Sequence, residues 1–471
     1  MCIRDSYLII QVGSGVLLMS GIMIHVGGGG SLNFDNFVHH SAEHPVAALA
    51  AGHEADHDAG HASATEGHGH DHASSQHLTL AGWLILAAFG IKCAFPLLHN
   101  WLQDAYPKAT VTGTVFLSAF TTKLAVYALA RGFAGFEPLI WIGTVMTLFP
   151  IFFAVVENDL RKVLAYSLNN QLGFMVVGVG IGSALAINGT VAHAFCHILY
   201  KSLLFMSMGA VLYRVGTAKA TELGGLYRTM PWTALFCGIG AASISAFPLF
   251  SGFVSKSMIL SALAEEHRYI NWLLLLVASA GVMEHSGIKI PFFAFFGHDS
   301  GKRPQEAPRH MLIAMGITAA LCILIGVAYP ILYAMLPSKI DYQPYTTHHV
   351  IAQLQLLLMS ALAFLALMKS GLYPPEVRSE NLDFDWTYRR LLPSLFGPLH
   401  GPWKAAGGLG EAFDRNWDMV SKSVRAGIGG IVELVGKLHR PTGFFGRSWS
   451  TNGMATWAAI LLATYLLLYY R

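Results

Sequence analysis

The sequence predicts an all-α polytopic membrane protein with about eleven transmembrane helices. Of the 471 residues, 54% are hydrophobic and only 12% are charged, whereas soluble domains carry about 25% charged residues. Apolar runs long enough to cross a bilayer recur along the whole chain. The lipid bilayer is therefore the first partner that the sequence predicts, while a net charge of +3 is too small to indicate nucleic acid.

Eleven apolar segments are the candidate helices. They are expected near residues 7–26, 78–99, 110–131, 136–156, 163–186, 190–214, 230–263, 270–298, 310–336, 350–371 and 452–470. Lysine and arginine concentrate in the loops after even-numbered segments, at Lys108, Arg161, Lys162, Arg214, Lys219, Arg228, Lys302, Arg303 and Arg309. Positively charged loops stay on the cytoplasmic side, so these loops are predicted to face the cytoplasm, and the first loop, residues 27–77, the exterior.

The predicted first loop is rich in histidine. Residues 39–77 contain ten of the 22 histidines, among them His53, His57, His61, His68, His70 and His72. One interpretation is a tract that captures metal ions. The other is a solvated Ala/Gly/His-rich insertion that binds metal weakly, since nothing in the spacing fixes a coordination geometry.

The two ends of the chain are expected to differ from the helical bundle at 7–336. Residues 1–6, MCIRDS, lead directly into the first span and are predicted to be a non-native leader, with upstream helices missing. A further transmembrane helix is expected within 337–371, a cytoplasmic amphipathic segment at 372–451 and a last transmembrane helix at 452–471. The amphipathic segment could lie on the membrane surface or pack against partner subunits.

Several charged side chains lie inside the predicted spans. A charge at the centre of a membrane helix costs roughly 2.5–3.5 kcal/mol, so such residues usually serve a function. Lys92 lies deep in the second segment, and Pro96 is expected to distort the helix beside it. Lys123 lies deep in the third segment. The alternatives are a Lys92 side chain that reaches the membrane surface and a Lys123 side chain that is paired in a helix contact.

The seventh segment combines a predicted break with a lysine. Pro248 and Gly252 precede Lys256, and they predict unwound backbone that faces a cavity. The second and seventh segments therefore both join a break to a lysine, which is the best sequence indication of an ion pathway in a transporter built from repeats. The alternative is a Pro/Gly loop between two short helices.

Three protonatable residues line one face of the sixth segment, in HAFCHILYKSLLF. His193, His197 and Lys201 are spaced four apart and share a helix face over two turns. Histidine binds and releases protons near neutral pH, and burial disfavours the charged form of lysine, so we interpret them as a proton relay. Histidines satisfied within a core and a zinc site are the alternatives, but no third zinc ligand is evident.

The eighth segment carries a second group of titratable residues. Glu284, His285 and Lys289 lie within it. The carboxylate and the imidazole could load or release protons at the end of the relay. They could equally form a structural ion pair with Lys289, and the residues alone leave both interpretations open.

No cofactor is predicted. The five cysteines contain no C-x-x-C pair, so neither a disulfide framework nor an iron–sulfur cluster is expected. No glycine-rich nucleotide motif opens a helix after a strand. The chain is therefore predicted to be a transporter subunit and not itself a redox enzyme.

Residues from Tyr7 to about Leu336 resemble the family of proton-conducting membrane subunits. The resemblance is carried, in this order, by IKCAFPLLHNWLQDAYPKATVTGTVFLSAFTTKLAVYAL, VVENDLRKVLAYSLNNQLGFMVVG, AHAFCHILYKSLLFMSMGAVLY, ELGGLYRTMPW and SAFPLFSGFVSKSMIL. The family includes the antiporter-like subunits of respiratory complex I and the large subunits of Mrp-type cation/proton antiporters. Within it, GIKIPFFAFFGHDSGKR and GLYPPEVRSENLDFDW are most similar to the D-type subunit of Mrp-type Na+/H+ antiporters.

The resemblance implies a bundle of two inverted five-helix repeats, each with one broken helix. It places Lys92 at the lysine of the first broken helix, Lys123 at that of the next helix and Lys256 at the charged residue of the second broken helix. It places the histidines and lysine of the sixth segment at the centre of a hydrophilic axis. Two features of the sequence depart from the family. In the family, a glutamate that pairs with the lysine at the Lys92 position lies on the helix before the one that starts here at Tyr7, and we expect that helix to be missing. The His-rich first loop is not an assigned feature of the family.

The sequence therefore predicts an ion-translocating subunit of a multisubunit monovalent cation/proton antiporter in the bacterial inner membrane. Its expected partners are other membrane subunits, protons and a monovalent cation, with sodium as the first candidate. One alternative is a proton-pumping subunit of a redox-driven complex, either an NADH–quinone oxidoreductase or a membrane-bound hydrogenase. The others are a metal transporter that uses the His-rich loop and a haem-binding bundle that uses His193 or His197.

Overall fold

A computed structural model of the chain describes residues 3–31, 33–40 and 76–374, together with residues 376, 377, 381, 383, 384, 386, 387, 391 and 394. Contacts divide the chain into two units, Met1–Asp385 and Trp386–Arg471. The predicted helix at 452–471, most of the segment 372–451 and the histidines between His53 and His72 lie outside the described residues.

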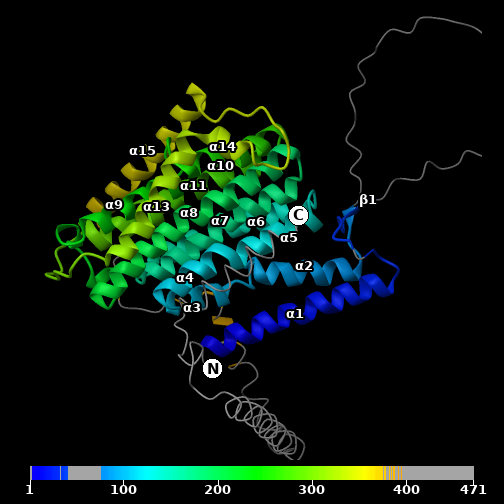
Figure 1. Ribbon diagram of the computed structural model, residues 1–471, viewed down its shortest axis with the longest axis horizontal. Helices are drawn as coiled ribbons and strands as arrows, with labels where there is room; N and C mark the ends of the chain where they lie inside the picture. Colours follow the sequence, from blue (N-terminus) through cyan, green and yellow to red (C-terminus); the bar gives the residue numbers. More distant parts are fainter. Residues whose placement is uncertain are drawn as a thin grey trace, which may run out of the picture. The chain divides into compact units, whose positions relative to one another are not determined.

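Long helices pack side by side in this unit (Figure 1). They are α1 (Ile3–Gly27), α6 (Pro138–Val156), α7 (Leu160–Ile181), α8 (Ala184–Val215), α13 (Arg309–Val327) and α15 (Thr347–Ser370). Seven helical stretches among the described residues are long and apolar enough to cross a membrane. This is fewer than the eleven predicted spans, in part because two predicted segments are divided into shorter apolar helices.

The N-terminal helix packs along the second predicted segment. Helix α1 begins within the predicted leader and contacts α2 (Leu80–Lys92), and Ser14 Oγ donates a hydrogen bond to the Ala88 carbonyl at 3.0 Å. At the ends of the predicted first loop, β1 (His39–His40) pairs antiparallel with β2 (Gln76–His77). The two ends of the loop therefore lie side by side.

Two helices are interrupted at the same sequence, AFPL. The elements that flank the breaks are α2 and α3 (Asn100–Lys108) for the first break, and α9 (Pro231–Ile244) and α10 (Ser251–Glu265) for the second. Ala94 and Leu97 have φ of 60° and 71°, and Ala246 and Leu249 have φ of 59° and 75°. Positive φ is uncommon outside glycine, so the repeated values show that both breaks adopt the same unusual backbone path. Pro96 and Pro248 are the prolines of the two AFPL sequences.

Gly252 allows two parts of the backbone at the second break, around Ser243 and Gly252, to lie close together. A Cβ at this position would lie 1.8 Å from the carbonyl oxygen of Ser243. We therefore expect Gly252→Ala to lower stability by about 1–3 kcal/mol through overpacking, measured as a lower unfolding temperature of the purified protein. Gly238→Ala is the matched control, because a Cβ there meets nothing within 4 Å. Equal unfolding temperatures for the two variants would contradict this account.

Two other predicted segments contain π-helical turns. In the third, η1 (Leu117–Thr121) lies between α4 (Val111–Phe116) and α5 (Thr122–Gly132). The eighth comprises α11 (Tyr269–Val282), η4 (Met283–Ile288), α12 (Lys289–Pro291) and η5 (Phe292–Phe296). The remaining short elements are η2 (Ala220–Glu222), η3 (Leu226–Arg228) and α14 (Tyr329–Tyr333). π turns frequently mark functional sites, and here they accompany the predicted lysine and histidine positions.

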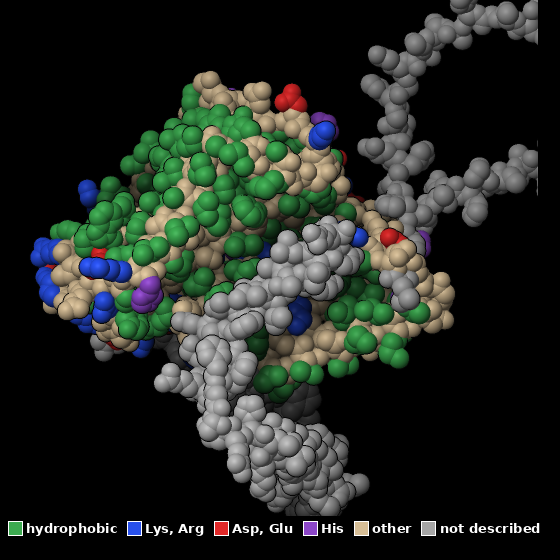
Figure 2. All heavy atoms as spheres, viewed as in Figure 1, with side chains coloured by type: hydrophobic (Ala, Val, Ile, Leu, Met, Phe, Trp, Pro, Cys, Tyr) green, Lys and Arg blue, Asp and Glu red, His purple; other side chains and the backbone are tan. Residues whose placement is uncertain are grey.

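Loops predicted to face the same side of the membrane lie at the same end of the bundle. Asp159 and Lys219 form a β-bridge between the fourth and sixth loops. Arg268 pairs with Glu137 at 2.7 Å between the seventh and third loops. In Figure 2, hydrophobic side chains cover the middle of the face shown, and lysine and arginine gather mostly at one end. The pairing of even with even and odd with odd loops agrees with helices that run alternately up and down.

Candidate functional site

Buried titratable side chains meet where three helical segments pack together. Lys123, His193, His197, Lys201 and Lys256 are each at most 6% exposed. They come from α5, α8 and α10, and α8 packs against both of the others. The structure therefore brings together five of the six residues that the sequence analysis assigns to the relay.

The centre of this site is the α8 row, defined as His193, His197 and Lys201. His193 Nδ1 lies 3.1 Å from Ser255 Oγ, and its Nε2 lies 3.5 Å from Tyr200 Oη. The His193 and His197 rings are 6.3 Å apart between centroids. Among the described residues, neither nitrogen of His197 nor the Lys201 ammonium has a hydrogen-bond partner. Burial of a polar group without a hydrogen-bond partner is costly.

Lys256 binds the end of the first half of the second broken helix. Its Nζ donates a hydrogen bond to the carbonyl of Ile244, the last residue of α9, at 3.2 Å. It also lies 5.0 Å from the centre of the Phe174 ring. Cations are favoured at helix C-termini, where carbonyls lack partners. The break thus holds Lys256 in place, while the neighbouring Ser255 contacts His193 of the α8 row.

Lys123 is held by the π turn that precedes it. Its Nζ donates hydrogen bonds to the carbonyl of Ser118, within η1, at 2.5 Å and to Thr122 Oγ1 at 3.3 Å. Helix α5, which carries Lys123, packs against α8.

Lys92 lies apart from this group. It is the last residue of α2, is half-buried, and donates a hydrogen bond to Gln11 Oε1 of α1 at 2.5 Å. None of the contacts recorded among the described residues joins it to the α8 row. Its role in a relay remains a prediction.

Lys289 binds the end of α6. Its Nζ donates to two carbonyls in the last turn of α6 and to the carbonyl of Glu157 at 2.8 Å, and it pairs with the Glu376 carboxylate at 2.8 Å. Burial raises the pKa of Glu376, and the attraction of Lys289 only partly offsets this. The recorded ion pair of Lys289 is thus with Glu376, and both interpretations of Glu284 and His285 remain predictions.

His285 of the eighth segment is linked to α7 through a pair of serines. It is fully buried, its Nδ1 lies 2.8 Å from Ser286 Oγ, and this hydroxyl donates to Ser167 Oγ of α7 at 2.7 Å. A role for His285 at the end of the relay remains a prediction.

Amide and hydroxyl groups that the sequence analysis missed surround the α8 row. Tyr200 Oη donates to Gln171 Oε1 at 3.2 Å, and Gln171 Nε2 donates to Asn170 Oδ1 at 2.6 Å. Asn169, Asn170 and Gln171 are consecutive and fully buried in α7. Three adjacent amides within an apolar segment were the sequence signal that could have identified them.

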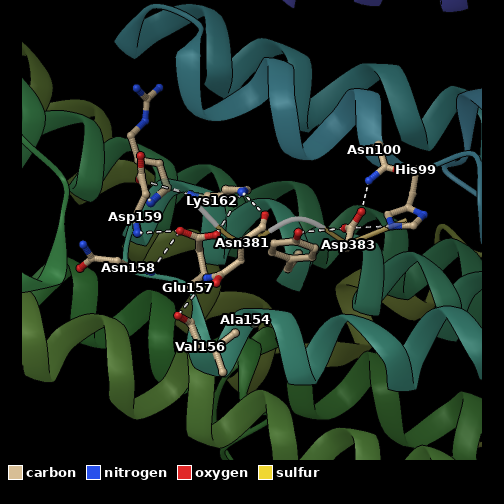
Figure 3. Close-up of polar contacts among 12 residues, drawn as sticks. His99, Asn100, Ala154, Val156, Glu157, Asn158, Asp159, Lys162, Asn381 and Asp383 are labelled. Atoms are coloured by element: carbon tan, nitrogen blue, oxygen red, sulfur yellow. Dashed lines mark hydrogen bonds and ion pairs between the residues drawn. The ribbon is translucent and has the colours of Figure 1, made fainter. Parts of the chain in front are cut away.

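A second polar cluster lies at the start of α3 (Figure 3). Asp383, which follows α15, pairs with His99 Nε2 at 3.2 Å and accepts hydrogen bonds from Tyr166 Oη at 2.9 Å and from Asn100 Nδ2. Burial raises the pKa of Asp383, but the hydrogen bonds, led by that of His99, outweigh it and hold the pKa at about 2. Sequence reasoning missed this cluster because 284 positions separate the two residues.

The described residues contain no group of three or more histidine, cysteine, aspartate or glutamate side chains arranged to hold a metal ion. The two α8 histidines that raised the zinc alternative instead have Ser255 and Tyr200 as neighbours.

Comparison with known proteins assigns the family. The sequence profile described as NADH:quinone oxidoreductase/Mrp antiporter, TM, matches residues 6–283, more than half of the chain. The chain belongs to this NADH:quinone oxidoreductase/Mrp antiporter family. The match contains the α8 row and Lys256, and it confirms the family resemblance inferred from the sequence motifs.

Relatives within the NADH:quinone oxidoreductase/Mrp antiporter family come from both antiporters and redox complexes. The D-type subunit of the Na(+)/H(+) antiporter of Alkalihalophilus pseudofirmus is 32% identical over 265 residues, which is 53% of each protein. Hydrogenase-4 component B of Escherichia coli K12 is 28% identical over 299 residues, 55% of this chain and 44% of that protein. NADH-ubiquinone oxidoreductase chain 5 of Dugong dugon is 31% identical over 233 residues, 47% of this chain and 37% of that protein. The chain therefore spans about half or less of the length of these relatives.

A solved structure supports the fold. The Mrp complex from Dietzia sp. DQ12-45-1b contains a chain with a TM-score of 0.57 and 22% identity, over 70% of this chain and 66% of that one. The chain thus has the multi-pass membrane fold of this family. The predicted fold class is confirmed, although not every predicted span is seen among the described residues.

Proposed function

We propose that the chain is an ion-translocating subunit of a multisubunit monovalent cation/proton antiporter in the bacterial plasma membrane. The proposal rests on one observation, the buried titratable groups that α5, α8 and α10 bring together. Charged groups within a membrane are costly, and they usually mark ion or proton paths. A bundle that required only packing would carry leucine or alanine at these positions.

In this proposal, protons move between Lys123 and Lys256 through the α8 row. Lysine and histidine can each bind and release a proton, and the side chains of the row are one helical turn apart. Because like charges repel strongly at low dielectric constant, a proton gained at Lys123 favours proton release further along the row. Lys92 would extend the path at the first broken helix.

The exchanged ion is proposed to be a monovalent cation, with sodium as the first candidate. The support is the relative whose name assigns it to a Na(+)/H(+) antiporter. An inward proton gradient would then drive sodium outward through the complete complex. Other membrane subunits would form the cation path together with this chain.

A proton-pumping subunit of a redox-driven complex is the second candidate. The relatives named hydrogenase-4 component B and NADH-ubiquinone oxidoreductase chain 5 support it. The same lysines and histidines would carry the protons, but the driving force would come from a redox partner. No cation would then be exchanged.

Everted membrane vesicles that carry the intact complex separate the two candidates. A proton gradient is imposed, sodium, potassium or lithium chloride is added, and a pH-sensitive dye is followed. Antiport predicts dequenching with at least one cation, and Lys123→Ala is expected to lower its initial rate by at least about 100-fold, as for loss of a proton-transfer group. The matched control is Lys369→Ala, which removes an exposed lysine at the end of α15. Acidification with NADH or another reductant, without any cation response, would instead identify the redox-driven complex.

A further inference from the structure

Described residues after α15 contact the end of the bundle where α6 connects to α7, which is the fourth predicted loop. Asn381 Nδ2 donates to the carbonyl of Val156 at 3.1 Å, and Lys162 Nζ donates to the carbonyl of Asn381 at 3.1 Å. Two residues later, Asp383 reaches the start of α3 (Figure 3). This segment thus brings the Asp383 carboxylate to the start of α3, the helix that follows the first break.

His99 and Asp383 form a buried pair. Their side chains are 3% and 2% exposed. The carboxylate contacts His99 Nε2, while the buried Nδ1 has no hydrogen-bond partner among the described residues. The carboxylate also binds Tyr166 of α7, and α6 presents the Phe149 ring, whose centre is 4.5 Å from that of the imidazole. An imidazole held in this way can take a proton at Nδ1, and the adjacent carboxylate stabilises the imidazolium.

Polar side chains lead from this pair toward the α8 row. Gln103 lies one turn beyond His99 on α3, and Asn169 lies on α7, which packs against α3. The amide atoms of both are buried and have no partner among the described residues. One turn along α7 from Tyr166, which binds Asp383, Asn170 Oδ1 accepts a hydrogen bond from Gln171 Nε2. Gln171 Oε1 in turn accepts the hydrogen bond of Tyr200 beside the α8 row.

We propose that His99 and Asp383 form a proton-exchange site between the aqueous phase at this end of the bundle and the α8 row. His99 is the exchanging group, and Asp383 is a positioning residue. His99 Nδ1 takes a proton from a hydronium ion, which leaves a water molecule, and the imidazolium later gives the proton to water on the side of the α8 row. The inference rests on the proposed proton transport of the chain.

The pH dependence of transport distinguishes this role from a structural one. The pKa of Asp383 is held at about 2, so its carboxylate is charged over the working range of pH. Without the carboxylate, the imidazolium is less favoured. Asp383→Asn is therefore expected to move the pH profile of dye dequenching toward lower pH by about one unit, as expected for the loss of an adjacent opposite charge.

The variants are measured in everted vesicles with the intact complex, at matched amounts of protein in the membrane. His99→Gln and Asp383→Asn are expected to slow transport by at least about tenfold, and added imidazole is expected to restore part of the rate to His99→Gly. Asn381→Ala is the matched control, because it removes a docking contact of the same segment without touching the pair. Its rate and pH profile are expected to equal those of the wild type.

Two results would overturn the site while leaving the relay intact. One is normal transport by His99→Gln under conditions where Lys123→Ala is inactive. The other is an equal loss in Asn381→Ala and Asp383→Asn without a pH shift, which would assign the segment a docking role only. A wild-type complex that moves no protons with any cation or reductant would refute both the site and the proposed function.

Discussion

Replacing Lys256 with arginine is expected to stop proton transport even though the positive charge is retained. The Lys256 ammonium donates to the carbonyl of Ile244 at the second helix break, and a guanidinium can donate there as well. Arginine stays protonated in proteins, whereas a buried lysine can release its proton. We expect the initial rate of dye dequenching to fall by at least about 100-fold in Lys256→Arg.

The interpretation of this variant depends on intact folding. Arginine is larger than lysine, and Lys256 is only 1% exposed, so the unfolding temperature of the purified complex must be compared with that of the wild type. Lys369→Arg at the exposed end of α15 controls for the change of residue type. Transport by Lys256→Arg at more than half of the wild-type rate would show that Lys256 acts as a fixed charge and does not carry the proton.

The Lys201→Met variant is expected to be inactive and more stable than the wild type. Lys201 is fully buried, and its ammonium has no hydrogen-bond partner among the described residues. Methionine has a similar shape and carries no charge to desolvate. Replacing buried ionic groups with apolar residues often stabilises proteins by about 1–4 kcal/mol, so we expect a higher unfolding temperature together with loss of proton transport.

Lys123→Met is the matched comparison for this effect. Its ammonium donates to the carbonyl of Ser118 in the π turn, so methionine would leave that carbonyl without its donor. A buried group that loses its partner costs about 1–3 kcal/mol, and we expect no gain of stability at this position. If Lys201→Met and Lys123→Met lowered the unfolding temperature equally, the Lys201 ammonium would be shown to contribute hydrogen bonds that hold the bundle together.

The joint outcome of the two stability measurements bears directly on mechanism. If a lysine lowers the stability of the fold and is required for transport, its presence is explained by function, as is common at functional sites. The opposite pattern, with stability and transport lost together, would point to a structural cation. Lys289 already shows the features of such a cation, since carbonyls at the end of α6 and the Glu376 carboxylate surround its ammonium.

The amino-acid sequence alone determined the features that depend on local geometry. The spacing of His193, His197 and Lys201 places them on one helix face wherever that helix packs. Pro96 and Pro248 interrupt their helices because proline cannot donate a backbone hydrogen bond. Family membership also follows from motifs that are short and contiguous.

Tertiary structure alone decided which charges meet. Glu284 is the near neighbour of Lys289 in the sequence, yet the ion pair is made by Glu376, which follows α15. Asp383 likewise reaches His99 across 284 positions. The pattern of apolar residues indicates which face of a helix is buried, but it does not indicate which helix covers that face. Many different neighbouring helices could bury the same apolar area equally well. Pairing between side chains is therefore set only when the helices pack and the segment after α15 folds back onto them.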